Sequence, residues 1–108
     1  MNAQPADPPI VIDQGDDGTV AITTPPGLSI TGVIGWDLLV GPARGGPSTK
    51  TYAGTATTAN GVTTAAWTIP AADTAMAGVK WAVARVRYAA SRRTFYRADL
   101  QISPNFTN

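Results

Sequence analysis

Cysteine and histidine are both absent from the chain, and all seven acidic residues are aspartates, so glutamate is absent as well. Without cysteine there can be no disulfide and no thiolate metal site, and without histidine the usual general base and the commonest metal ligand are missing. A serine or threonine nucleophile would therefore have no histidine to activate it. We predict a structural or binding protein that is not an enzyme, with no catalytic residue, no cofactor and no metal site.

Charged residues are also few, at 14% of the chain against ~25% in an average soluble protein. Long hydrophobic runs are missing too, since the longest apolar stretch, residues 33–40, falls far short of the ~20 residues of a membrane-spanning helix. The first residues are polar and contain prolines, so they lack the basic and apolar regions of a secretory signal. We expect neither a membrane span nor a secretory signal.

The charges that are present are unevenly distributed along the 108 residues, although the net charge is only +1. Residues 1–40 hold five aspartates and no basic residue, whereas residues 41–108 hold eight basic residues and two aspartates. Oppositely charged surfaces steer proteins toward each other, although both groups can also be simply solvated. We interpret the following residues as partner-binding: Asp7, Asp13, Asp16 and Asp17 in the acidic group, and Arg87, Arg92, Arg93 and Arg97 in the basic group.

Turn-forming residues divide the chain into short extended segments. Their patterns predict strands at residues 10–12, 19–23, 33–40, 49–53, 63–69, 81–88 and 95–102. The first two strands are expected to form a hairpin, Asn60-Gly61 predicts a tight turn, and residues 71–77 can form one helical turn. Seven short strands without a long helical period predict an all-β fold, namely an immunoglobulin-like antiparallel β-sandwich, with a small barrel as the alternative.

The N-terminal residues are expected to form an extended arm outside this domain. Pro5, Pro8 and Pro9 fix their own φ angles and push the preceding residues toward extended geometry. We therefore divide the chain into an arm at residues 1–12 and a β-sandwich domain at residues 13–108.

Period-two alternation also selects the predicted core, because alternate side chains of a strand point to the same face. The predicted core residues are Ile34, Trp36, Leu38, Trp67, Ile69, Val86, Leu100 and Ile102. In the last hairpin the same alternation puts Phe95 on the polar face, and some registers bring Asp99 near Arg85 or Arg87, where opposite charges attract.

Two further groups of residues were considered as sites. Asp16 and Asp17 lie between glycines, which favours a turn over an acid/base pair, and with Asp13 they match no complete calcium loop. The arginines near Phe95, Tyr96 and Trp81 are suited to phosphate contacts and base stacking. However, the isoelectric point of about 8.1 is modest for a nucleic-acid module, so we do not expect nucleic acid as the partner. A solvated hairpin tip and a protein partner are the alternatives.

Several segments resemble a known family. Residues 66–75 read AWTIPAADTA and are followed by Gly78, by Trp81-Ala82-Val83 and by Arg85, while residues 94–104 read TFYRADLQISP. A looser match is LSITG at residues 28–32. These motifs resemble small bacteriophage virion domains such as the N-terminal domain of baseplate upper proteins, in which a strand ends in a Pro-x-x-Asp-Thr turn and a final hairpin follows. The resemblance covers about residues 13–108, but the Arg92-Arg93 tip and the proline-bearing arm depart from it.

The resemblance implies an immunoglobulin-like building block of a phage particle and brings no catalytic residues with it. We therefore expect a virion structural protein assembled in the bacterial cytoplasm, in particular a capsid decoration protein on the outer surface of the head. Its expected partners are the major capsid protein, other virion proteins and copies of itself. The alternatives are a tail, baseplate or fibre adaptor, or a glycan-binding module in which Trp81 or Tyr52 stacks on a sugar ring.

Overall fold

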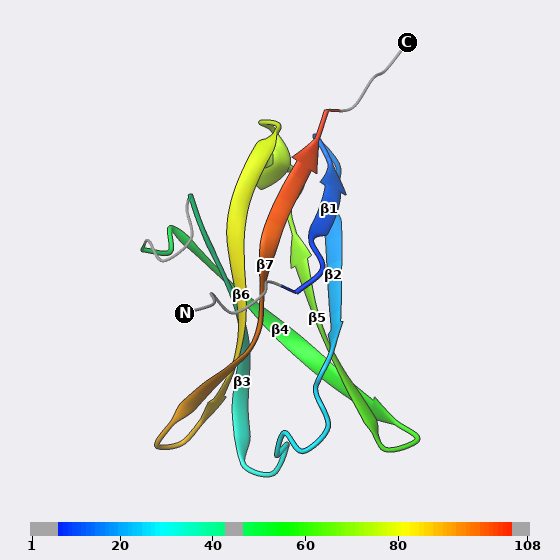
Figure 1. Ribbon diagram of the computed structural model, residues 1–108, viewed down its shortest axis with the longest axis vertical. Coiled ribbons are helices and arrows are strands. Elements are labelled where there is room, and N and C mark those ends of the chain that lie inside the picture. Colours follow the sequence, from blue (N-terminus) through cyan, green and yellow to red (C-terminus); the bar gives the residue numbers. More distant parts are fainter. Residues whose placement is uncertain (1–6, 43–46, 105–108) are drawn as a thin grey trace, which may run out of the picture.

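The computed structural model of the protein describes residues 7–42 and 47–104. Within these ranges the elements are β1 (Ile10–Asp13), β2 (Gly18–Thr23), β3 (Val33–Gly41), β4 (Lys50–Ala59), β5 (Val62–Ile69), the 3-10 helix η1 (Ala71–Thr74), β6 (Gly78–Tyr88) and β7 (Arg92–Ser103) (Figure 1). The predicted all-β fold is confirmed, and so is the single helical turn after the fifth strand.

The seven strands form one continuous sheet in the order β1-β7-β6-β3-β4-β5-β2. Strand β4 makes this possible, because its first half, residues 50–54, pairs with β3 and its second half, residues 55–59, pairs with β5. The sheet curls at this strand until its two edge strands meet, with Gly18 of β2 against the Ile12 side chain of β1. The architecture thus lies between the sandwich and the barrel considered above. The immunoglobulin-like topology stays a prediction.

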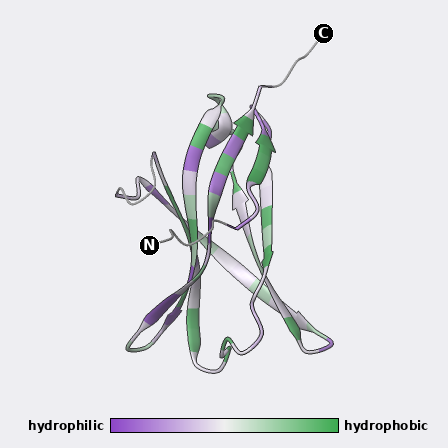
Figure 2. Ribbon diagram, viewed as in Figure 1, coloured by the Kyte–Doolittle hydropathy of each residue, from purple (hydrophilic) through white to green (hydrophobic). Residues whose placement is uncertain are grey.

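Two predicted turns are found where the sequence places them. Asn60 and Gly61 link β4 to β5 with φ angles of 53° and 77°, which is the left-handed backbone that a two-residue hairpin turn requires. Strands β6 and β7 form the predicted last hairpin, whose strongly hydrophilic tip is visible in Figure 2.

The predicted hairpin between the first two strands is wrong. Strand β1 pairs in parallel with β7, and β2 pairs with β5 instead. Each short apolar strand therefore completes a different edge of the curled sheet, which buries Ile12 as well as Val20 and Ile22. Since Ile12 is part of the core, the domain begins near Ile10 rather than at residue 13, and the pairing of β1 with β7 makes the sheet mixed rather than purely antiparallel.

Seven of the eight predicted core residues are buried: Trp36, Leu38, Trp67, Ile69, Val86, Leu100 and Ile102. Ile34 is the exception and is wrong, because its side chain is 62% exposed. The register between β3 and β6 shifts between Val33 and Gly35, so β3 carries one extra residue at this point. This bulge breaks the period-two alternation, turns Ile34 outward and leaves Val33 packed against the core.

A second bulge has the opposite effect on Phe95. Tyr96 pairs with Ala84, whereas Thr94 pairs with Arg85, so Phe95 is the extra residue of β7. The sequence places it on the polar face, but its ring packs edge-on against Trp36 with 5.8 Å between centroids and stacks on Trp67 at 6.5 Å. The same register sets Asp99 opposite Trp81, so the expected approach of Asp99 to Arg85 or Arg87 is wrong.

The two buried tryptophans are joined by a hydrogen bond across the curled sheet. The indole Nε1 of Trp67 on β5 donates to the backbone carbonyl of Trp36 on β3 over 3.2 Å. Gly54 of β4, the strand between them, leaves room for this contact, since a Cβ atom there would lie 2.5 Å from Trp67 Nε1 and 2.5 Å from the Ala66 carbonyl oxygen. The bend of the sheet and the Trp67 hydrogen bond therefore depend on the same residue.

Gly54→Ala is expected to lower the free energy of unfolding by about 1–3 kcal/mol, the usual cost of overpacking a core. The measurement is urea unfolding followed by tryptophan fluorescence. Thr57→Ala, at an exposed position of the same strand, is the control and should change stability by no more than about 0.5 kcal/mol. Equal stability of the Gly54 variant and the wild type would contradict the role of this contact.

Candidate functional site

The predicted acidic residues Asp13, Asp16 and Asp17 lie in and beside the turn between β1 and β2. This turn is attached to η1, because Asp17 Oδ1 accepts a hydrogen bond from the Ala71 N–H at 2.8 Å and the Thr74 hydroxyl donates to the Asp16 carbonyl at 2.7 Å. The three aspartates are exposed. Inside the domain, Asp16 and Asp17 hold η1 at the end of the sheet. In the described part of the chain, no three acidic side chains gather as metal ligands would.

The acidic turn and the arginine hairpin lie at opposite ends of the molecule. Asp13 pairs with Ser103, the last residue of β7, whereas Arg92 is the first residue of that strand. At about 3.3 Å per residue, a strand of this length separates its two ends by roughly 36 Å. Figure 1 shows the acidic turn at the top and the β6–β7 hairpin at the lower left. The structure therefore keeps Asp13, Asp16 and Asp17 away from Arg92 and Arg93.

Asp7 is the acidic residue that does meet the arginine hairpin. Its N–H donates to the Arg97 carbonyl at 2.8 Å, and its carboxylate Oδ2 accepts from the Arg97 N–H at 2.9 Å. The Tyr96 hydroxyl also donates to the Pro8 carbonyl. Because Ile10 pairs with Leu100, the contact between Asp7 and Arg97 continues the parallel register of β1 and β7. The chain is thus attached to β7 from Asp7 onward.

Three of the predicted partner-binding residues line one groove beside the first half of β7. Asp7, Arg93 and Arg97 share this groove of about 320 Å³ with Thr94, Phe95 and Tyr96 and with residues 25–28 from the loop after β2. We call it the β7 groove. Sequence reasoning selected its charged residues but not its opposite wall, since nothing local connects residues 25–28 to a strand about seventy positions later.

Arg87, another predicted partner-binding residue, is engaged within the chain. Its Nε lies 2.6 Å from Asp37 Oδ2, and Arg85 Nη2 lies 3.4 Å from the same oxygen. The Asp37 side chain is only 8% exposed, while that of Arg87 is 41% exposed. Gly35 permits this geometry, because a Cβ atom there would collide with the Arg87 guanidinium. The sequence feature that could have predicted this ion pair is the single aspartate, Asp37, within the otherwise apolar segment 33–40.

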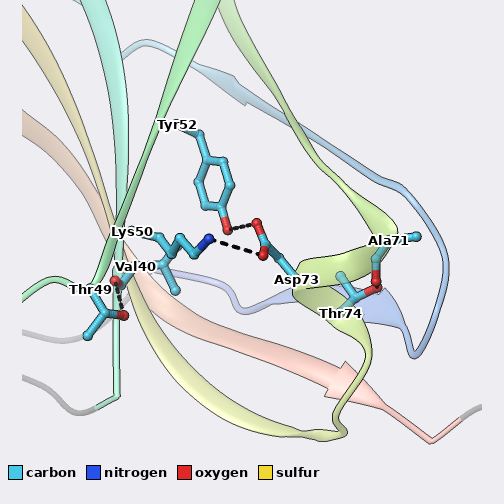
Figure 3. Close-up of polar contacts among 7 residues, drawn as sticks. All are labelled: Val40, Thr49, Lys50, Tyr52, Ala71, Asp73 and Thr74. Carbon is cyan, nitrogen blue, oxygen red and sulfur yellow. Dashed lines mark hydrogen bonds and ion pairs between the residues drawn. The ribbon is translucent and has the colours of Figure 1, made fainter.

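A second cluster of polar residues lies near η1 (Figure 3). The sequence selected Tyr52 for sugar stacking and Asp73 as a residue of the helical turn, but it did not bring the two together. The Tyr52 hydroxyl donates to Asp73 Oδ2 at 2.9 Å, and Lys50 Nζ lies 3.3 Å from Asp73 Oδ1. These three residues and Lys80 border a cavity of about 270 Å³ whose apolar lining includes Val40, Ile69, Met76 and Leu100. The cluster ties η1 to β4 and gives the cavity a charged rim.

The contacts of this cluster shift two titrations in opposite directions. Burial raises the pKa of Tyr52 to about 12, and the hydrogen bond to Asp73 and its negative charge act in the same direction. The hydrogen bond from Tyr52 lowers the pKa of Asp73, helped by Lys50 and Lys80 and opposed by desolvation. At neutral pH the phenol therefore donates to an ionised carboxylate. In the β7 groove, burial and the charge of Asp7 likewise raise the pKa of Tyr96.

Trp81, the other aromatic residue considered for sugar stacking, is on the outer face of the sheet. It borders a shallow pocket of about 180 Å³ together with Leu39, Val83 and Arg85. Tyr52 and Trp81 therefore belong to two separate surfaces. The two residues that the sequence offers for stacking on a sugar ring cannot form one site together.

Comparison with family models, with curated proteins and with solved structures found no match to this chain. The likeness to phage virion domains accordingly rests on the sequence motifs quoted above. In the described residues, no helix has the length and hydrophobicity that a membrane crossing requires.

Asp37→Asn is expected to lower the free energy of unfolding by about 1–3 kcal/mol, because the substitution leaves two partly covered arginines without their carboxylate. Chemical denaturation at low salt measures the loss. Asp13→Asn, which removes an exposed carboxylate from β1, serves as the matched control and should be close to neutral. If both variants lost the same stability, the buried position of Asp37 would have no special role.

The Tyr52 phenol is expected to ionise near pH 12 rather than at its ordinary pKa of 10.0, which ultraviolet absorbance of tyrosinate measures, with Tyr52→Phe to assign the step. Since the folded pKa is raised, the stability from this phenol is fully present below pH 10 and is lost as the pH rises through 12. Asp73→Asn should lower the pKa of Tyr52 without restoring the ordinary value, because burial remains. An unchanged pKa in that variant would contradict the contribution of Asp73.

Proposed function

We propose that this chain is a non-enzymatic bacteriophage virion protein that binds the outer surface of the head as a capsid decoration protein. The observation that carries this proposal is the pair of hydrogen bonds between Asp7 and Arg97, one between backbone groups and one from the Arg97 N–H to the Asp7 carboxylate. They fix the point at which the arm joins the domain, and this point lies beside the exposed arginine hairpin. The arm and the arginines, which the sequence selects separately, therefore belong to one contact face.

The proposed contact face consists of Asp7, Arg92, Arg93 and Arg97, and we assign to it also the arm residues 1–6, which lie outside the described residues. All three arginines are exposed in the described structure. A cationic surface of this kind steers a protein toward an acidic partner and adds specificity more than affinity. The capsid surface is the partner that the proposal assigns to this face.

The acidic turn at the other end of the molecule lies outside this contact face. Asp13, Asp16 and Asp17 are separated from the arginine hairpin by the length of β7, so a copy bound through its arginines keeps them clear of the capsid surface.

A glycan-binding module on the virion is the second candidate, and the cavity near η1 favours it. Its apolar lining and its rim of Tyr52, Asp73, Lys50 and Lys80 combine the apolar surface and the polar groups found in small-molecule sites. A glycan array tests this candidate directly, with Tyr52→Ala as the variant that should lose any hit. An array without hits removes it.

A protein without residues 1–6 is expected to bind purified heads much more weakly than the full chain, because it lacks the part of the arm that the proposal assigns to the capsid contact. The measurement is co-sedimentation with heads that lack the protein. The truncation must end before Asp7, since removal of β1 would also remove buried Ile12. The circular dichroism spectrum and Tm should therefore be unchanged, and undiminished sedimentation would refute the role of the arm.

The copy number per particle distinguishes a protein of the head from a protein of the tail. Gel staining against the major capsid protein should give amounts of the same order for a lattice-wide decoration protein. A small fraction of that amount would instead identify a tail, baseplate or fibre part and would overturn the proposed location.

A further inference from the structure

The outer edge of β7 is only partly occupied by β1. Strand β7 has twelve residues, but β1 pairs with its last four, from Leu100 to Ser103. Asp7 adds the contact at Arg97. Among residues 7–42 and 47–104, no strand pairs with this edge between Arg93 and Tyr96. A strand edge of this kind offers N–H and C=O groups to any extended chain that lies beside it.

The β7 groove follows this part of the edge. Arg93, Thr94, Phe95 and Tyr96 form one side of it, and residues 25–28 form the other. Pro25 and Pro26 have no N–H group, so this wall cannot act as a full pairing strand for β7. The groove of about 320 Å³ therefore combines a strand edge that no strand among residues 7–42 and 47–104 pairs with and an opposite wall that cannot pair with it fully.

The charge of the groove indicates the chemistry of its occupant. Arg93 and Arg97 both line it and are exposed, and the Asp7 carboxylate is already engaged by the Arg97 N–H. Carboxylates form strong charge-assisted hydrogen bonds with guanidinium groups. An acidic segment is thus favoured over an apolar or basic one.

A second copy of this chain is a poor occupant. Its clustered acidic residues Asp13, Asp16 and Asp17 belong to a tight turn whose backbone is already bonded to η1, including a bond from the Gly15 N–H to the Thr74 carbonyl. Such a turn cannot lie along a strand edge as an extended chain. The acidic segment must therefore come from another protein.

We propose that the β7 groove binds an acidic, extended segment of a partner protein. The segment adds as a strand to the outer edge of β7 at residues 93–96, while its carboxylates pair with Arg93 and Arg97. This is recognition by strand addition, in which main-chain hydrogen bonds supply affinity and side chains supply specificity. The inference rests on the proposed function only in assigning the segment to another virion protein, since binding itself is a property of the isolated chain.

The test is fluorescence anisotropy with the full chain and a labelled peptide in which pairs of aspartates alternate with pairs of threonines. Such a peptide presents carboxylates on both faces when it is extended, as Arg93 and Arg97 require because the bulge at Phe95 puts them on opposite faces of β7. Saturable binding is expected, and the double variant Arg93→Ala, Arg97→Ala should weaken it at least about tenfold, the effect of losing strong ionic hydrogen bonds. Both side chains are exposed, so Tm should be unchanged. As a matched control, Arg93→Asp with Arg97→Asp should reject this peptide and bind the one that has lysine in place of every aspartate. Unaltered affinities would overturn the proposal.

A second peptide separates strand addition from simple charge attraction. The same peptide with every backbone amide N-methylated carries the same charge but has no N–H group to donate to β7, so it should bind at least about tenfold more weakly. Hydrogen exchange should slow at the Thr94 amide when the unmethylated peptide binds. Equal binding of the two peptides would refute strand addition.

The same assay also reveals whether something other than an acidic protein segment occupies the β7 groove. If the full chain binds no peptide but does so after removal of residues 1–6, the arm occupies the groove and the proposal is overturned. Tighter binding of single-stranded DNA at the same arginines would also overturn it. Particle binding without peptide binding refutes only the groove, whereas peptide binding without particle binding refutes only the capsid function.

Discussion

The hydrogen bond from the Trp67 indole to the Trp36 carbonyl spans the bend that gives the sheet its shape. These residues belong to β5 and β3, which are separated in the sheet by β4, so a flat sheet would keep them apart. They meet because β4 changes partners at Gly54, where the absence of a side chain lets the indole pass. Phe95 then covers both tryptophan rings from β7. Aromatic groups from three strands thus bury a large apolar surface at the bend.

The curled sheet explains where the charged residues end up. Once β4 has turned the sheet, β1 reaches β2 and the Asp13–Asp17 turn lies against η1 at one end of the molecule. The β6–β7 hairpin extends to the other end, carrying Arg92 and Arg93. The charge asymmetry of the sequence therefore becomes an asymmetry in space, with an acidic end and a basic end. The arginine hairpin and the acidic turn are therefore two separate surfaces.

The cavity near η1 and the β7 groove differ in the polar groups that they leave available to a ligand. Near η1, Tyr52 and Lys50 are both engaged with Asp73, so this cluster has a structural role before any ligand arrives. In the β7 groove, Arg93 and Arg97 are exposed, and the adjacent strand edge is open to an added chain among the described residues. A binding surface needs polar groups that can still form hydrogen bonds or ion pairs with a ligand. The β7 groove is therefore the better docking surface, whereas the cluster near η1 serves to hold η1 against β4.

The sequence alone determined the all-β class, the Asn60-Gly61 turn, the last hairpin and seven of the eight core residues. Each of these depends on alternation or turn chemistry within a few residues, which is local information. It also selected Asp7, Arg93 and Arg97, but not their meeting in one groove. Only the tertiary structure decided the parallel pairing of β1 with β7, the burial of Asp37 under Arg87, the outward turn of Ile34 and the inward turn of Phe95. A bulge shifts the alternation of buried and exposed side chains by one residue, and strand pairing depends on the fit between surfaces that are distant in the sequence. The spacing of nearby side chains predicts neither of these features.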